Sequence, residues 1–134
     1  MDYRITSDPA ELPLAEVERL LKETYWAGRR SSEKIERSMR HSDCYGLRVD
    51  GEARLVGFAR VITDYATTYY LCDVVIDPGY RGRGLGKALL AHIESRPEYA
   101  GLRGLLITRD AHALYRKFGY EVLDGRAMVK SLNC

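Results

Sequence analysis

A glycine-rich, basic stretch in the second half of the chain places the tightest constraint on its fold. Residues 77–90 read DPGYRGRGLGKALL, so glycines at alternate positions lead directly into an apolar helix. Glycine adopts the left-handed conformations of tight turns and lets backbone amides approach a ligand closely. The free amides at the start of a helix, together with the helix dipole, favour an anion. Arg81, Arg83 and Lys87 add positive charge, so the stretch predicts a phosphate-binding loop.

Two common nucleotide-binding motifs do not match this stretch. A Walker loop ends in Gly-Lys-Ser/Thr, but the Gly86-Lys87 pair is followed by Ala88. The dinucleotide fingerprint Gly-x-Gly-x-x-Gly, counted from Gly82 and Gly84, requires a third glycine where the chain has lysine. On residue chemistry alone, a phosphate-binding loop and a flexible basic loop that caps a core helix both remain open.

The composition predicts one compact domain, residues 1–134, because a chain of 134 residues with 46% apolar residues can bury a single core. A net charge of +2, from 21 basic and 19 acidic residues, is too balanced for a nucleic-acid-binding surface, so no nucleic-acid partner is expected. No apolar run approaches the roughly 18 residues of a membrane span, and no signal peptide is recognisable. We therefore expect no membrane partner.

The cysteines indicate a reducing compartment. Cys44, Cys72 and Cys134 are odd in number and widely spaced, so they are expected to be free thiols in the cytoplasm. His41 and Cys44 lie three residues apart, which is too few ligands for a metal site. No metal is expected.

Alternating and helical hydrophobic patterns divide the chain into the strands and helices of an α/β fold. Strands are expected at residues 3–6, 44–49, 55–63, 68–76 and 102–108, with a final ribbon at 120–123 and 127–132. Helices are expected at residues 12–25, 31–41, 84–95 and 111–118. A mixed sheet with helices on its faces follows, because an amphipathic helix between strands must pack back onto the sheet.

Two segments resemble the GNAT N-acetyltransferase superfamily. Its acyl-CoA signature has Arg or Gln, two residues, Gly, one residue, then Gly or Ala, and Arg81, Gly84 and Gly86 fill these places. Downstream, residues 111–120 read AHALYRKFGY and resemble the family's second conserved helix, with Ala four places before Tyr and a Phe-Gly-aromatic ending. The two motifs stand in the family's order, about thirty residues apart.

This resemblance implies a GNAT-like α/β fold with a mixed, mostly antiparallel central sheet of six to seven strands and about four helices on its faces. It also implies transfer of the acetyl group of acetyl-CoA to a primary amine, on a small molecule or an exposed protein amine, by direct attack in a ternary complex. The family places a backbone amide of the preceding strand against the thioester carbonyl. The matching cofactor-binding residues are Val74, Val75, Ile76, Arg81, Gly82, Arg83, Gly84, Leu85, Gly86 and Lys87.

Tyr115 and Asp73 are the candidate catalytic residues. Tyr115 stands where many family members have a general acid, so the resemblance implies that it protonates the departing thiolate, with simple packing as the alternative. Asp73 interrupts an apolar strand just before the cofactor segment and is a candidate general base. A structural aspartate paired with Arg60 on the neighbouring strand explains that position equally well. His112 and solvent are the other candidates for the base.

The resemblance implies that the acceptor pocket is bounded by residues 25–30 and 64–67. The candidate substrate-binding residues are Trp26, Arg29, Arg60 and Tyr65. Aromatic residues beside a sheet more often pack in the core, so the acceptor stays open.

One departure from the family pattern motivates an alternative function. Thr108 stands where many members carry Asn, seven positions before the tyrosine. A CoA-binding sensor or interaction domain with little transfer activity is therefore the second hypothesis. A monomer and a homodimer are both compatible with the sequence, and the C-terminal ribbon offers a surface for pairing.

Overall fold

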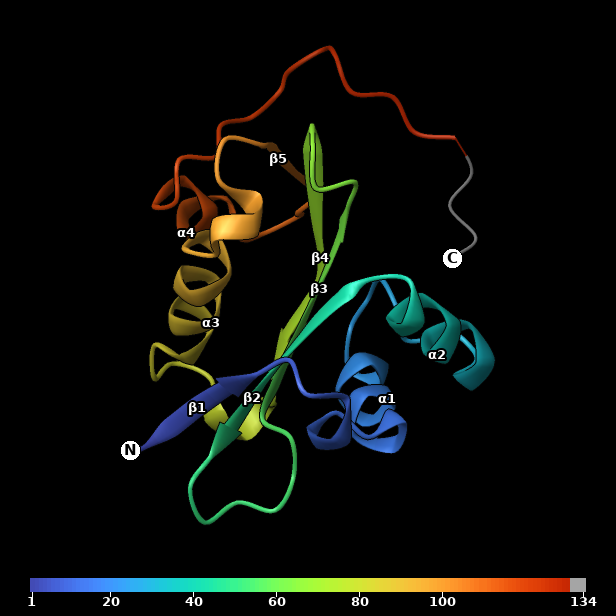
Figure 1. The fold of residues 1–134 in the computed structure, drawn as a ribbon, viewed down its shortest axis with the longest axis vertical. Coiled ribbons are helices and arrows are strands. Elements are labelled where there is room, and N and C mark those ends of the chain that lie inside the picture. Colours follow the sequence, from blue (N-terminus) through green and yellow to red (C-terminus); the bar gives the residue numbers. More distant parts are fainter. Residues whose placement is uncertain (131–134) are drawn as a thin grey trace.

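The computed structural model describes residues 1–130, which form five strands, four helices and three short 3-10 turns (Figure 1). In chain order these elements are β1 (Tyr3–Thr6), η1 (Pro9–Glu11), α1 (Leu14–Lys22), α2 (Ser32–Arg40), β2 (Asp43–Val49), β3 (Gly57–Thr63), β4 (Thr68–Ile76), η2 (Pro78–Tyr80), α3 (Leu85–Glu94), η3 (Pro97–Tyr99), β5 (Arg103–Leu106) and α4 (His112–Arg116).

A single mixed sheet lies between two layers of helices. Its strand order is β1-β2-β3-β4-β5, with antiparallel neighbours from β1 to β4 and a parallel β4–β5 pair. Helices α1 and α2 cover one face, and α3 and α4 cover the other (Figure 1). Val17 and Leu20 of α1 pack with Phe58 in one core cluster, while Leu89 of α3 packs with Val61 in the other. The expected mixed α/β sheet with helices on its faces is confirmed.

The number of strands corrects the sequence-based expectation. The sheet has five strands rather than six to seven, and as far as residue 130 the ribbon expected at 120–123 and 127–132 does not form. Residues 131 and 132 of that ribbon lie outside the described residues. Alternating apolar residues form a strand only where their backbone hydrogen-bonds to a neighbouring strand. In this chain residues 121–130 are exposed and pair with no strand.

The sheet splits in the middle of β4. The β4–β5 pairing runs from Thr68 opposite Arg103 to Leu71 opposite Leu106, so the second half of β4 has no β5 partner. On the other side of β4, the register with β3 shifts by one residue between Phe58 and Arg60. This irregularity is a β-bulge, which bends a strand and increases its twist. The bulge and the end of β5 together open the sheet just before the glycine-rich loop.

Candidate active site

The glycine-rich loop has the left-handed turns that its sequence predicts. Gly82 and Gly84 have φ angles of 78° and 79°, and Gly84 is the N-cap residue of α3. No side chain caps this helix, so the amides of its first turn are not occupied by a capping group. Gly86 differs, because it is helical and an added Cβ would meet only Ile76 Cγ1, at 3.6 Å. The conformational requirement for glycine therefore applies at positions 82 and 84.

Asp77 anchors the loop to the rest of the fold. Its Oδ1 accepts a hydrogen bond from the Gly79 amide at 2.8 Å, and its Oδ2 accepts one from Arg19 Nη1 at 2.8 Å. Partial burial acts to raise the pKa of Asp77, but the Arg19 guanidinium and the Gly79 amide outweigh burial and hold this pKa below its usual value. Arg19 also donates to the Leu55 carbonyl at 2.6 Å. We did not predict this anchor, although the Asp-Pro pair before the glycines is a recognisable turn signal.

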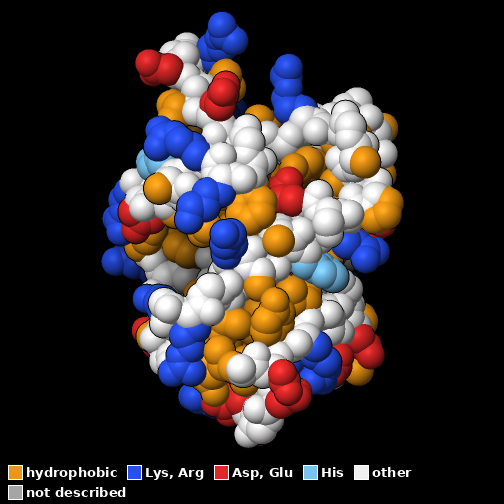
Figure 2. All heavy atoms as spheres, turned by 90° about the vertical axis from the view of Figure 1, so that its left-hand side faces the viewer, with side chains coloured by type: hydrophobic (Ala, Val, Ile, Leu, Met, Phe, Trp, Pro, Cys, Tyr) orange, Lys and Arg blue, Asp and Glu red, His pale blue; other side chains and the backbone are white. Residues whose placement is uncertain are grey.

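The basic residues of the loop lie at the surface. Arg81, Arg83 and Lys87 are all exposed, and Arg83 lies 5.1 Å from the centroid of the Tyr80 ring. Arg81 donates from Nε to the Ile76 carbonyl at 3.1 Å. Figure 2 shows the face that α3 and α4 cover, where Lys and Arg side chains border hydrophobic patches. The positive charge expected near a phosphate is therefore present and accessible.

Asp73 lies in a buried cluster of hydrogen-bond donors. Its Oδ2 accepts hydrogen bonds from Arg30 Nη1 at 2.7 Å and Arg60 Nε at 2.9 Å, and its Oδ1 accepts one from Trp26 Nε1 at 3.1 Å. The Asp73 side chain is 1% exposed. Burial alone would raise the pKa of Asp73, but the two guanidinium groups outweigh burial and lower it. Because a general base works best with a pKa near the working pH, these contacts favour the structural alternative.

The predicted acceptor residues do not form one group. Trp26 and Arg60 belong to the Asp73 cluster, and Arg60 also donates from Nη1 to Ser42 Oγ at 3.0 Å. Arg29 is exposed, and Tyr65 at the β3–β4 turn donates its hydroxyl proton to Asp43. Their role in acceptor binding stays a prediction.

The loop between α1 and α2 spans the split in the sheet. At the β4 side, Trp26 and Arg30 bind the Asp73 carboxylate. At the β5 side, the Arg109 guanidinium lies 3.7 Å from the centroid of the Tyr25 ring. The Tyr25 and Trp26 rings meet edge to face at 4.9 Å. Sequence analysis missed the Tyr25–Arg109 contact, since no spacing pattern connects positions so far apart in the chain.

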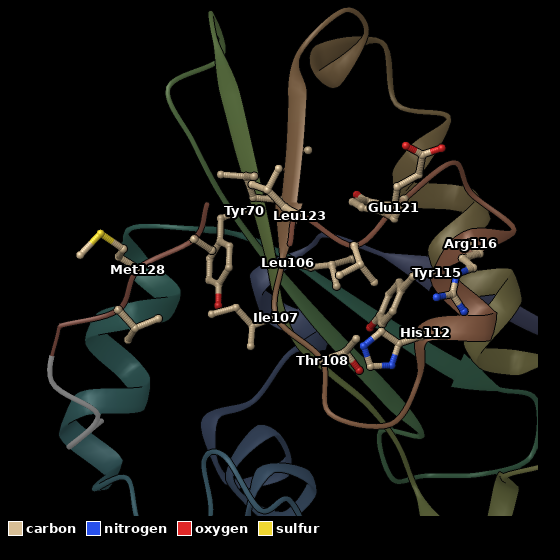
Figure 3. Close-up of a pocket in the computed structure, with 16 residues that line it drawn as sticks. Tyr70, Leu106, Ile107, Thr108, His112, Tyr115, Arg116, Glu121, Leu123 and Met128 are labelled. Atoms are coloured by element: carbon tan, nitrogen blue, oxygen red, sulfur yellow. The ribbon is translucent and has the colours of Figure 1, made fainter. Parts of the chain in front are cut away.

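Tyr115 lies at one end of a cavity of about 400 Å³ beside β5. Figure 3 shows Thr108, His112 and Tyr115 converging at this end, while Tyr70 and Met128 lie at the other. Burial, with smaller contributions from Tyr25 and Asp110, raises the pKa of Tyr115 to about 12. The phenol is thus protonated at neutral pH and available as a donor. The lining includes neither the glycine loop nor the second half of β4, so this cavity shares no residue with the predicted cofactor site.

Thr108, which stands where many family members have asparagine, has a structural role. Its Oγ1 accepts a hydrogen bond from the Ala111 amide at 3.0 Å, which satisfies a backbone donor at the start of α4. This contact orients the helix that carries Tyr115.

Two absences apply to the described part of the chain. Within residues 1–130, no three His, Cys, Asp or Glu side chains lie together in a way that could hold a metal ion. Among the helices described above, none is long and apolar enough to cross a membrane.

A mixed sheet that splits in the middle of β4 and a glycine-bent start of α3 place a candidate anion-binding loop beside the opened sheet. Comparison with known proteins identifies the family. The acetyltransferase (GNAT) family matches residues 13–120. The chain belongs to this family.

Similar proteins support this assignment. The crystal structure of a GNAT-family protein from Xanthomonas campestris pv. campestris is 38% identical, with a TM-score of 0.88 over 98% of this chain and 93% of that one. A soybean (Glycine max) protein named histone acetyltransferase TAP1 is 31% identical over 111 residues, which is 81% of this chain and 45% of that protein. Glucosamine-6-phosphate N-acetyltransferase from Arabidopsis thaliana shares the fold, with a TM-score of 0.72 at 15% identity over 99% of this chain and all of that one.

The chain spans less than half the length of the soybean relatives, 45% of TAP1 and 29% of the protein named probable acetyltransferase TAP2. The names of the relatives differ in their acceptors. Family membership therefore supports acetyl transfer as the class of reaction, without specifying an acceptor.

Proposed function

We propose that this chain transfers the acetyl group of acetyl-CoA to a primary amine, on a small molecule or an exposed protein amine, by direct attack in a ternary complex. The observation that carries the proposal is the position of the loop. Left-handed Gly84 begins α3 shortly after β4 has separated from β5, so a phosphate-binding helix start lies beside an opened sheet. A donor held by its diphosphate at the loop can extend its acyl end along the open half of β4.

The loop residues supply the binding. The uncapped first turn of α3 offers backbone donors to a diphosphate, and the exposed Arg81, Arg83 and Lys87 supply charge-assisted contacts. Asp77 holds the start of the loop through its bonds to Arg19 and the Gly79 amide. This preorganisation lowers the cost of ordering the loop on binding.

The strand and Tyr115 act on the reacting groups. We assign Val74, Val75 and Ile76 to the backbone contact with the acyl donor, because this segment of β4 has no β5 partner. Tyr115 donates a hydrogen bond to the departing sulfur. With a pKa of about 12, it loses its proton only unfavourably to a thiolate, whose conjugate acid has a pKa of about 8.5 in cysteine. Its contribution is therefore hydrogen bonding that strengthens as negative charge develops on sulfur, and the released thiolate takes its proton from water.

Two further residues are poorly suited to the roles of general base and nucleophile. The Asp73 carboxylate is already bonded to three donors, so we propose that water removes the proton from the attacking amine. Burial raises the pKa of the Cys72 thiol to about 12, which makes it a poor nucleophile. Direct attack by the amine therefore fits better than an acyl-cysteine intermediate.

Calorimetry with acetyl-CoA, followed by a thiol-release assay with a panel of primary amines, tests this function. We expect saturable heat of binding and thiol release that depends on the amine. Binding without amine-dependent release would instead support the CoA-binding sensor. An absence of binding would contradict both.

A further inference from the structure

The cluster around Asp73 contains more positive than negative charge. Arg30 and Arg60 both form ion pairs with this one carboxylate, at 2.7 and 2.9 Å. Within residues 1–130, Asp73 is the only acidic residue paired with either guanidinium group. Two positive groups therefore share one negative group, which leaves one positive charge without a counter-charge.

This excess charge lies almost out of solvent. The Arg30 and Arg60 side chains are 11% and 10% exposed. A buried charge without a partner is costly, so buried ionic groups in proteins are normally paired. Arg19 shows the opposite balance, because its side chain is 31% exposed and contacts two carboxylates. A positive excess is thus not a general feature of the arginines in this fold.

Asp43 does not balance the excess charge. It precedes Cys44 of β2, which pairs with Arg60 across the β2–β3 ladder. Successive residues of a strand point to opposite faces of the sheet, so the Asp43 side chain lies on the other face from Arg60. There it accepts a hydrogen bond from the Tyr99 hydroxyl at 2.6 Å. The missing counter-charge is therefore not supplied from β2.

The two arginines retain hydrogen-bond donors for an acidic group. Each guanidinium has five N–H groups. The hydrogen bonds found within residues 1–130 engage one nitrogen of Arg30, which bonds Asp73, and two nitrogens of Arg60, which bond Asp73 and Ser42. The planar guanidinium matches the paired oxygens of a carboxylate or a phosphate. Such a group would satisfy both the remaining donors and the excess charge.

The cluster adjoins the place proposed for the acyl donor. Asp73 directly precedes Val74 and Val75, which belong to the segment of β4 that we assign to the backbone contact with the donor. A strand rises about 3.3 Å per residue, so these positions lie about 3–7 Å along β4 from the cluster. A small molecule bound at the arginines can therefore present a second group to the acyl donor.

The cluster also reaches the surface. Trp26, which donates a hydrogen bond to Asp73, is 37% exposed. Ile62 lies two residues after Arg60, on the same face of β3, and is 42% exposed. Figure 1 shows the β3–β4 hairpin extending beyond α1 and α2. The arginines thus lie at the border between the part of this face that the helices cover and the part that is open to a ligand.

We propose that the acceptor is a primary amine that also carries an acidic group, a carboxylate or a phosphate, and that Arg30 and Arg60 bind this group. The acidic group supplies the second counter-charge, while Asp73 holds the two guanidinium groups in position. It takes no part in bond making. The amine nitrogen forms a bond to the acetyl carbon, the carbon–sulfur bond breaks, water takes the proton of the amine, and the thiolate takes a proton from water.

This inference rests on the proposed function, because it assigns a substrate class to that reaction. Matched acceptors test it in the wild-type protein. Thiol release from acetyl-CoA is measured with ω-amino acids, aminoalkyl phosphates and unsubstituted alkylamines, each over the same series of chain lengths. We expect kcat/KM to be at least about tenfold higher for one of the acidic series, because charge-assisted hydrogen bonds form only with the acidic group.

The preferred series identifies the acidic group as a carboxylate or a phosphate. If kcat/KM for both acidic series is equal to or lower than that for the alkylamines, the proposal is overturned while acetyl transfer itself stands.

Variants locate the acidic group. Arg30→Gln removes the excess charge, so the preference for the acidic series should fall by at least about fivefold, and Arg30→Lys should retain part of it. Arg37→Gln removes the same charge from an exposed position on α2 and should keep the full preference. A full preference in Arg30→Gln, or its loss in Arg37→Gln, would show that the acidic group binds elsewhere.

Calorimetry separates a failure of this inference from a failure of the proposed function. If no amine releases thiol, the proposed function fails, and the same three series are titrated into the protein with and without CoA. Heat of binding from an acidic series that the alkylamines do not give, and that Arg30→Gln loses, supports the acidic-group site. An absence of such heat overturns it.

Discussion

The Asp73 carboxylate accepts a hydrogen bond from Arg60 Nε at 2.9 Å, where the β3–β4 register shifts and the sheet opens. Asp73 has a φ of 54°, in the left-handed region that non-glycine residues adopt only at a cost of about 1–3 kcal/mol. Arg30 and Trp26 bind the same carboxylate, so the strained residue is held from both β3 and the α1–α2 loop. The ion pair therefore stabilises the bulge that shapes the candidate site.

Replacing Asp73 by Asn should lower the free energy of unfolding by about 3 kcal/mol at pH 7, because two buried guanidinium groups lose their counter-charge. Asn keeps the size of the side chain and tolerates the left-handed conformation. Urea denaturation measures the difference. Asp50→Asn at an exposed turn is the control and should change stability by less than about 0.5 kcal/mol. Equal effects of the two variants would contradict the stabilising role of the Asp73 cluster.

Wild type and Asp73→Asn should differ in how their free energy of unfolding depends on pH. The pKa of Asp73 is lower in the folded chain than in the unfolded chain, where it is about 3.9. The charged form thus stabilises the fold above about pH 4, and this contribution is lost as pH falls through the folded pKa. The stability gap between wild type and Asp73→Asn should shrink in urea titrations at progressively lower pH. A gap independent of pH would show that charge is not its cause.

Gly84→Ala should weaken acetyl-CoA binding about tenfold. Alanine in the left-handed conformation of Gly84 costs about 1–2 kcal/mol, so the free variant should relax to another loop conformation. Binding must then restore the left-handed conformation, and its cost is subtracted from the binding free energy. Gly101→Ala is a matched control, because Gly101 has a φ of 80° and open space around its Cβ position, outside the loop. Calorimetry should show normal affinity in that control. Unchanged affinity in Gly84→Ala would remove the loop from the binding site.

Tyr115→Phe should reduce kcat by about tenfold to a hundredfold while the Kd for acetyl-CoA stays the same, since hydrogen bonding to the leaving group matters mainly in the transition state. Steady-state kinetics and calorimetry separate the two quantities. Tyr3→Phe, at an exposed position on β1, serves as the control. Full turnover by Tyr115→Phe would assign Tyr115 to packing alone.

Arg109→Ala should raise the acceptor KM by up to about fivefold, because an exposed cation–π contact contributes about 0.5–1 kcal/mol to holding the α1–α2 loop. The Kd for acetyl-CoA should not change, since Arg109 stacks on Tyr25 of the α1–α2 loop, which is not part of the glycine loop. Arg103→Ala, at an exposed position of β5, is the control for loss of a positive charge. An equal rise in KM for both variants would point to general electrostatics.

Sequence patterns predicted the elements because their causes are local. Apolar periodicity marked the helices and the long central strands, and glycine at positions 82 and 84 marked the left-handed turns. For Asp73 the sequence left two alternatives, a general base and a structural aspartate paired with Arg60. A buried carboxylate needs a partner, but the sequence does not show which residue supplies it. The ribbon predicted after residue 120 was wrong as far as residue 130, because residues 121–130 pair with no strand, and hydrophobic alternation alone does not show whether a segment pairs.

The sequence by itself determined the α/β class, the order of its elements and the loop at the start of α3, all of which follow from hydrophobic periodicity and glycine conformation over short stretches. Only the tertiary structure decided that Trp26 and Arg30 bind Asp73, that Arg109 stacks on Tyr25 and that, within residues 1–130, β5 pairs with β4 alone. These contacts join residues from separate elements. Their formation depends on how the packed layers bring distant parts of the chain together, which no local pattern records.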